Sequence, residues 1–363
     1  MTEISRTDIE AALKTYIDPH LGTDLVSAGA VRSIQLENGR VTVAIGLGFP
    51  AKSYVSRLTQ TLGEILRRLE GIEAIDVQVT WNVQPHKVQQ GQKPLPGVKN
   101  VIAVASGKGG VGKSTVAANL ALALSQEGAA VGILDADIYG PSVPRMLGAG
   151  GQPETRDGKT IEPKRAYGMA LMSIGFLVDE DTPMIWRGPM ATSALQQLLR
   201  QTNWGELDYL IVDLPPGTGD IHLTLTQQIP VAGAVIVTTP QDIALLDAMK
   251  GLKMFEKVKV PVLGIVENMS IHVCSRCGHE EALFGQGGGA QMAQKYGVPL
   301  LGQLPLDLSI RENADSGHPT VVADAGGPIA ARYREIARNA AARLSLRPRD
   351  MAGKFPDIVV ERG

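Results

Sequence analysis

Cysteine is almost missing from this sequence, because its 363 residues include only Cys274 and Cys277. So few cysteines exclude a disulfide scaffold. No apolar run reaches the roughly 18 residues that a membrane span requires. The N-terminal segment also has no apolar stretch of the kind found in secretory signals. The sequence therefore favours a cytoplasmic location and no membrane partner.

Aromatic residues are scarce as well, and the chain has no excess of positive charge. Aromatic residues make up 4% of the chain, and the formal net charge is -2 at pH 7. Single-stranded nucleic acids stack on aromatic side chains and duplexes attract basic surfaces, so no nucleic-acid partner is expected. Hydrophobic residues, at 44%, and 41 glycines are plentiful. This composition favours an α/β enzyme with tight turns, and the length suits about two domains.

Residues 1–83 carry the pattern of a small α+β domain. Its predicted helices and strands are 8–17, 31–36, 40–45, 52–69 and 75–81. The first two strands are joined by Glu37-Asn-Gly-Arg, a hairpin signal. Residues 84–97 are polar and rich in glycine and proline, so we interpret them as a linker. At the other end of the chain, residues 347–363 form a predicted irregular tail.

Residues 98–346 alternate apolar, strand-like runs with helical patterns. The runs are 101–106, 131–137, 171–176, 209–214, 234–239 and 262–268. The predicted helices include 113–126, 191–200, 243–257 and 328–344. Strands that are apolar on both faces are typical of a parallel sheet covered by helices. The alternation therefore predicts an α/β fold with a doubly wound, mostly parallel sheet.

A phosphate-binding loop follows the first of these strands. The sequence GKGGVGKST matches the pattern GxxxxGK followed by Ser or Thr, in the strand–loop–helix setting that the motif requires. Glycines let backbone amides form an anion-binding nest, and the helix directs its positive end at the phosphates. A chance glycine-rich turn would not explain this setting. The predicted nucleotide-binding residues are Gly107, Lys108, Gly109, Gly110, Val111, Gly112, Lys113, Ser114 and Thr115.

Several side chains around this loop have predictable tasks. Lys113 is expected to contact the β- and γ-phosphates of ATP, Ser114 to bind Mg2+, and Thr115 to face the α-phosphate. Asp213 ends an apolar strand in the Walker B manner and is expected to reach Mg2+ through water. The next residues, LPPGTGD, have the composition of a switch that moves when the γ-phosphate leaves.

Asp135 and Asp137 end the strand-like run before it. Carboxylates at the carboxyl edge of a parallel sheet lie beside bound phosphates. Asp135 is expected to support the loop or the metal, and helix capping is one open interpretation of Asp137. Asn268 also stands at a strand end, where asparagine is usually a turn residue.

The two cysteines form a C-x2-C pair within the sequence IHVCSRCGH. Two thiolates at this spacing can bind one metal ion or one edge of a cluster. A four-thiolate site needs two more, which a symmetric dimer would supply. Zinc is a competing ligand, because a thiolate pair in a glycine turn is half of a zinc ribbon. A redox disulfide and a pair of free thiols remain open as alternatives, but Gly278 excludes the haem motif.

An ordered set of motifs resembles the Mrp/ApbC family of iron–sulfur cluster carrier ATPases, which are MinD-like P-loop proteins. The set covers about 100–345 and consists of GKGGVGKST, LDADIYGPS, WRGPM at Trp186 to Met190, VDLPPGTGD, VENMS and CSRCG. The resemblance implies a P-loop ATPase that binds iron–sulfur clusters and delivers them to apoproteins with ATP binding and hydrolysis. It also implies a homodimer that works with apo iron–sulfur proteins and cluster-assembly factors.

The resemblance also implies roles for single residues. Lys108 would reach across the dimer to the partner's nucleotide, Asp137 would position the attacking water, and Asn268 would contact the adenine. A 4Fe-4S cluster would bridge two subunits through Cys274 and Cys277. The other open interpretation of Lys108 is a solvated loop lysine.

The N-terminal unit resembles a small domain shared with other cluster-assembly factors. Some members carry a cysteine in the loop that here reads Phe49-Pro-Ala-Lys-Ser, where this chain has none. A protein-interaction role is therefore expected for this domain. Two other functions remain as alternatives: a spatial-organising ATPase of the MinD/ParA type, and a zinc-bound scaffold ATPase.

Overall fold

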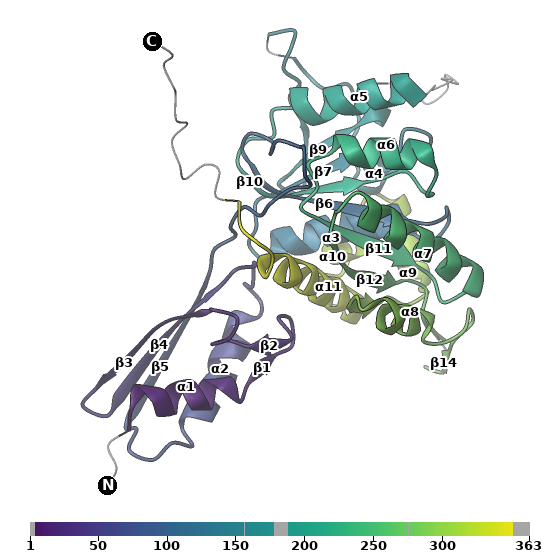
Figure 1. Ribbon diagram of the computed structural model, residues 1–363. Coiled ribbons are helices and arrows are strands. Elements are labelled where there is room, and N and C mark those ends of the chain that lie inside the picture. The colour runs from purple at the N-terminus through teal and green to yellow at the C-terminus, as the bar shows by residue number, and fades with distance from the viewer. Residues whose placement is uncertain (1–3, 156, 178–187, 275, 351–363) are drawn as a thin grey trace, which may run out of the picture.

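An eight-stranded sheet forms the centre of the larger part of the molecule in the computed structural model, which describes residues 4–155, 157–177, 188–274 and 276–350 (Figure 1). The strand order is β15-β12-β11-β6-β10-β7-β9-β8, and every neighbouring pair is parallel except β8 with β9. The strands are β6 (Val98–Ser106), β7 (Val131–Asp135), β8 (Lys164–Ala166), β9 (Met169–Ser173), β10 (Leu207–Asp213), β11 (Gly233–Thr238), β12 (Val262–Glu267) and β15 (Leu300–Gln303). The predicted doubly wound, mostly parallel sheet is confirmed.

Helices cover both faces of this sheet (Figure 1). One face carries α3 (Lys113–Gln126), α10 (Thr320–Ala323) and α11 (Pro328–Ser345). The other carries α5 (Gly188–Gln201), α6 (Asp220–Gln228), α7 (Asp242–Lys257) and α8 (Gly288–Tyr296). Helix α3 is alanine-rich and buried on nearly all sides because it lies between the sheet and α11. Among the described residues, no helix has the length and apolar character needed to cross a membrane.

The smaller part has the α+β fold that the sequence predicts. Its sheet pairs β3 (Val31–Glu37) antiparallel with β4 (Arg40–Leu47), and β4 parallel with β5 (Ala74–Trp81). The hairpin turn places Asn38 and Gly39 at φ 47° and 75°, which is the left-handed geometry of a tight hairpin turn. Two helices, α1 (Arg6–Lys14) and α2 (Val55–Leu66), pack together beside this sheet.

Some predicted element bounds are wrong. The helix expected at 8–17 spans Arg6–Lys14, because Ser5 caps it and exchanges hydrogen bonds with Asp8. Ile17–Asp18 instead forms β1, which pairs with β2 (Thr23–Asp24). The helix expected at 52–69 is shorter, at Val55–Leu66. The run at 171–176 leaves the sheet after Ser173, and strands β8 and β15 were not predicted.

The segment interpreted as a linker, 84–97, packs against the larger part. His86 is buried, and its backbone N–H donates to Asn100 Oδ1 at 3.1 Å. The buried Gln89 donates from Nε2 to the carbonyls of Thr226 and Gln227, each at 3.1 Å. Such side-chain anchoring leaves no periodic signal in a sequence. The division at 83 and 98 itself stays a prediction, and of the predicted tail only 347–350 is described.

One buried ion pair lies where the two parts meet. Glu127, at the end of α3, is fully buried and accepts a hydrogen bond of 2.8 Å from Nη1 of Arg338 on α11. The same nitrogen donates to Ser53 Oγ at 2.9 Å, and Arg338 Nε donates to Nε2 of His20 at 3.2 Å. His20 Nδ1 in turn lies 2.6 Å from Oδ1 of Asn339. Arg338 therefore joins α3, α11 and the N-terminal part.

Candidate functional site

The phosphate-binding loop lies between the end of β6 and the start of α3, at the carboxyl edge of the sheet. Gly110 and Gly112 both have φ 81°, a left-handed geometry that glycine adopts without strain. A cavity of about 210 Å³ opens above the loop. Its lining includes the predicted residues Lys108, Gly109, Gly110, Gly112, Lys113, Ser114, Thr115 and Asp137. The carboxyl edge is where ligands bind in open α/β sheets.

Lys113 is the centre of a charged cluster beneath this cavity. Its Nζ atom lies 2.5 Å from Asp213 Oδ1 and 3.8 Å from Asp137 Oδ2, and it donates to Ser114 Oγ at 3.1 Å. The side chain is only 6% exposed. The fold therefore brings together four predicted site residues from the loop, from β10 and from the segment after β7.

Asp135 and Asp213 end neighbouring strands and face each other in register. Asp135 is fully buried and accepts hydrogen bonds of 3.1 Å from the backbone N–H groups of Asp137 and Val143 and from Ser173 Oγ. Burial, assisted by the negative charge of Asp213, raises the pKa of Asp135 to about 7. Asp135 thus holds the loop that carries Asp137 in place.

The two carboxylate oxygens of Asp213 differ in their contacts. Burial raises its pKa, although Lys113 partly opposes that effect. Oδ1 contacts Lys113, whereas Oδ2 is buried and has no hydrogen-bond partner within the described part of the chain. A buried carboxylate oxygen without a partner is costly unless a ligand satisfies it. Oxygen donors from Ser114 and Asp213 are what Mg2+ prefers, so these residues fit that ion.

The two remaining predicted nucleotide contacts differ in their surroundings. Lys108 is half-buried at the cavity and has no ion-pair partner among the described residues, while its carbonyl accepts from Ser106 Oγ at 2.9 Å. Asn268 is 6% exposed, and its Nδ2 donates to the Val111 carbonyl at 2.9 Å. The asparagine is therefore held against the phosphate loop, and its contact with adenine stays a prediction.

The segment after Asp213 packs against a histidine that sequence reasoning missed. Pro216 lines the phosphate cavity, and the His222 ring lies behind the segment against Gly217, where a Cβ atom would come within 2.7 Å of Cε1. Gly217 has φ 118°, so this close approach requires glycine. Burial lowers the pKa of His222, and Pro216 and Asp137 oppose this only in part. A histidine two residues after the PPGTGD motif was the available signal.

The cysteine pair occupies a small hairpin beyond β12. Strands β13 (His272–Val273) and β14 (Glu280–Glu281) form it, and Gly278 turns the chain at φ 71°. The Cys274 N–H donates to the His279 carbonyl at 2.9 Å, and backbone N–H groups of the hairpin lower the pKa of Cys274. Cys274 is half-buried and Cys277 is exposed. Within the described residues, no group of three or more potential metal ligands exists.

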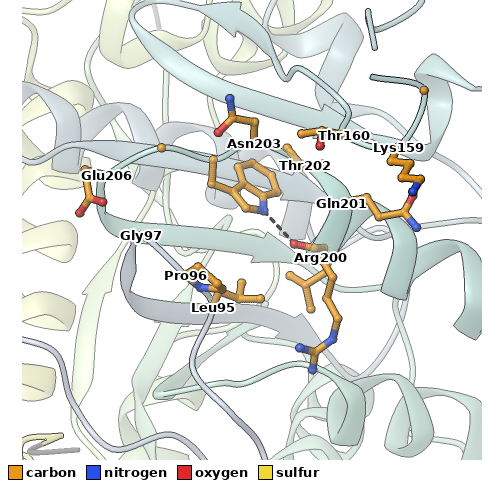
Figure 2. A pocket seen from close by; sticks show the side chains of 14 residues that line it. Leu95, Pro96, Gly97, Lys159, Thr160, Arg200, Gln201, Thr202, Asn203 and Glu206 are labelled. Atoms are coloured by element: carbon orange, nitrogen blue, oxygen red, sulfur yellow. Dashed lines mark hydrogen bonds between the residues drawn. The ribbon is translucent and has the colours of Figure 1, made fainter. Parts of the chain in front are cut away.

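A larger cavity, of about 720 Å³, lies at the opposite edge of the sheet (Figure 2). Its lining includes Pro96, Lys159, Arg200 and Glu206, close to where β6 and β10 begin. Among the described residues that line it there is no histidine, cysteine or aspartate. The amino edge of a parallel sheet is not where such folds bind nucleotides, so this cavity is not the nucleotide site.

Comparison with known proteins identifies the family. A family model described as NUBPL iron-transfer P-loop NTPase matches residues 97–341. The chain belongs to this family. A second model, described as an iron-sulfur cluster assembly protein, matches residues 6–79. The expected resemblance to iron–sulfur carrier ATPases is therefore confirmed, although Trp186 and Arg187 of the WRGPM motif lie outside the described residues.

Relatives of this NTPase family cover most of the chain. The iron-sulfur cluster carrier protein of Escherichia coli K12 is 51% identical over 343 residues, which are 94% of this chain and 93% of that protein. The iron-sulfur cluster transfer protein NUBPL of Mus musculus is 54% identical over 259 residues, covering 71% and 81%.

Solved structures agree with the fold of the larger part. An Archaeoglobus fulgidus nucleotide-binding protein in complex with ADP is 42% identical with a TM-score of 0.55, covering 61% of this chain and 87% of that one. The cell division ATPase MinD of Pyrococcus furiosus, at 23% identity and a TM-score of 0.51, covers 66% and 97% and shows the MinD-like fold alone.

Proposed function

We propose that this protein binds iron–sulfur clusters and transfers them to target apoproteins, with ATP binding and hydrolysis. The observation that carries the proposal is a pair of free cysteines on a small hairpin that follows β12, the strand whose end touches the phosphate loop. A pair with one exposed and one half-buried thiol suits a cargo that must enter and leave. The names of the E. coli and mouse relatives support the same function.

The ATPase half of the proposal assigns roles to the charged cluster. Lys113 binds the β- and γ-phosphates, and Asp137 positions the attacking water. Ser114 and Asp213 would hold Mg2+, with the unpartnered Asp213 Oδ2 accepting a hydrogen bond from its water shell. Bound Mg2+ neutralises charge that develops on the phosphate oxygens. The buried, preorganised position of Lys113 supports hydrolysis rather than binding alone.

The cluster would be shared by a homodimer. One chain supplies Cys274 and Cys277, whereas a 4Fe-4S cluster of the common type needs four thiolates. Ile243 and Leu246 on α7 are 69% and 56% exposed, and the backbone of the same helix touches Gly107 of the phosphate loop. This apolar surface beside Lys108 suits a second copy of the chain. The partners would be apo iron–sulfur proteins and cluster-assembly factors in the cytoplasm.

A cysteine hairpin with a glycine turn also resembles half of a zinc site, so zinc is the second candidate ligand. The spatial-organising alternative would need an amphipathic or basic membrane or DNA surface. The net charge of -2 gives it no support.

Cluster transfer to a ferredoxin-type apoprotein tests the function directly. Cluster-loaded protein is mixed anaerobically with the acceptor and an iron chelator, with and without Mg-ATP, and acceptor absorption is followed. We expect transfer that the chelator does not intercept and whose rate depends on ATP, because the cluster passes between thiolates without free iron. If the chelator captured all the iron and the acceptor gained no cluster, the result would argue against a carrier.

A further inference from the structure

A short stretch of chain joins the phosphate loop to the cysteine hairpin. Strand β12 ends at Glu267, and only five residues separate Asn268 from Cys274. Asn268 is fixed at both its backbone and its side chain. Its N–H donates to the Thr238 carbonyl at 2.8 Å, and its Nδ2 donates to the Val111 carbonyl at 2.9 Å.

The amide of Asn268 is also packed tightly against the start of α3. A Cβ atom at Gly112 would collide with Asn268 Nδ2, so the glycine and the amide are in direct contact. Val111 and Gly112 are both residues of the phosphate loop, whose backbone amides surround bound phosphates. A shift of this backbone on nucleotide binding would therefore move or release the Asn268 side chain.

The next residue is held in an unusual backbone geometry. Met269 has φ 57°, one of only a few non-glycine residues with positive φ in the described chain. Such geometry is unfavourable for a residue with a side chain and persists only where the surroundings impose it. Contacts on both sides of Met269 impose it here, so release of either side would let the backbone relax.

Beyond Met269, the chain is fixed to one neighbouring segment. Ser270 donates to the Leu304 carbonyl from both N–H and Oγ, at 2.9 and 3.0 Å. The Leu306 N–H donates to the Ile271 carbonyl at 2.8 Å, and His272 Nδ1 lies 3.1 Å from the Leu306 carbonyl. These hydrogen bonds continue directly into β13 and Cys274. The segment between Asn268 and the hairpin is therefore ordered, so that a displacement of Asn268 also displaces the hairpin.

The buried Glu267 directly precedes the segment that carries the cysteines, and its carboxylate contacts the end of that segment. Glu267 accepts from the Gly289 N–H at the start of α8 and from Gln303 Nε2 at 2.6 Å. The chain therefore leaves β12 at Glu267 and returns to the same side chain at the start of α8. The hairpin is anchored at its base, and Asn268 is the part of that base that contacts the phosphate loop.

We propose that Asn268 is a positioning residue that couples the nucleotide state of the phosphate loop to the cysteine hairpin, with Met269 as the backbone pivot. The inference rests on the proposed function, because it assigns the route by which ATP would alter cluster handling. Coupling of this kind is reciprocal, so occupation of the cysteines also changes nucleotide affinity.

Thiol accessibility in cluster-free, reduced protein tests the coupling. The alkylation rates of Cys274 and Cys277 are measured by mass spectrometry with and without saturating Mg2+ and a non-hydrolysable ATP analogue. We expect the nucleotide to change the rate at least about fivefold in the native chain, the lower end of usual coupling energies. In Asn268→Ala, the analogue is added at a concentration that titration shows to be saturating. The ratio of the alkylation rates with and without the analogue should then fall towards one.

Asn203→Ala is the matched control, because this exposed amide lies at the opposite edge of the sheet, and its response should equal that of the native chain. Met269→Gly keeps the Asn268 amide but removes the backbone restriction, so its response should be weakened. If Asn268→Ala fails to bind the analogue, the alkylation response of Met269→Gly is the deciding measurement.

An unresponsive native chain, or a full response in the deciding variant, would overturn the proposal. The second result would mean that a partner subunit simply covers the cysteines. Because no cluster is present, neither result bears on cluster carriage, whose failure would appear separately as failed iron loading.

Discussion

Replacement of Lys113 by methionine is expected to lower the ATP hydrolysis rate by at least about 10²-fold, the usual loss when one preorganised hydrogen-bond donor to developing charge is removed. Methionine keeps the aliphatic volume and removes the ammonium group that lies 2.5 Å from Asp213 and 3.8 Å from Asp137. Among the described residues that line the cavity, Lys108 is the other cation, and it is only half-buried. Phosphate release at saturating ATP measures the effect.

Lys99→Met is the matched control for this variant. Lys99 is at the start of β6, the strand that ends at the phosphate loop. Its side chain is 40% exposed and forms an ion pair with Asp208. Its loss should leave the hydrolysis rate near that of the native chain. Hydrolysis in Lys113→Met within a few-fold of the native rate, with an intact fold, would show that the phosphate loop is not the hydrolytic site.

Replacement of Arg338 by alanine is expected to lower the free energy of unfolding by about 3–5 kcal/mol, the usual cost of leaving a buried charge without its partner. Glu127 is fully buried, and Arg338 donates to it at 2.8 Å while also bonding to Ser53 and His20. The loss is a large fraction of the 5–15 kcal/mol that holds a typical domain together. Urea unfolding followed by circular dichroism measures it.

Arg311→Ala supplies the comparison. Arg311 pairs with Glu312 and Asp315 on the exposed helix α9 (Leu308–Asp315), where its side chain is 64% exposed. Exposed pairs contribute about 0–1 kcal/mol, so this variant should unfold near the native midpoint. Equal losses in the two variants would mean that water, or the hydrogen bonds that Glu127 also accepts from the Ser53 N–H and Oγ, satisfy the carboxylate without Arg338.

The parts of the fold that could be predicted are those with local signals. Helix α3 spans Lys113–Gln126 as expected, because the glycine loop fixes its start and its alanine-rich pattern fixes its extent. The meeting of Asp135 and Asp213 followed from two apolar strands ending in carboxylates, since parallel strands share a carboxyl edge.

The parts that could not be predicted depend on tertiary contacts. Gln89 anchors its segment through carbonyls at the end of α6, and no local pattern marks a residue for such a bond. His222 acquires its place only because Gly217 allows the ring to approach. The contact between Asn268 and Val111 joins positions far apart in the chain, so an asparagine at a strand end gave no sign of it.

The most direct test of the account is the iron, sulfide and zinc content of anaerobically reconstituted protein, with its absorption spectrum. The native chain is compared with a Cys274→Ser/Cys277→Ser variant. We expect about two iron and two sulfide per chain in a dimer, corresponding to one four-iron cluster on four thiolates, and none in the variant. Zinc alone in the native chain, or iron that is unaffected by loss of both cysteines, would contradict the carrier function.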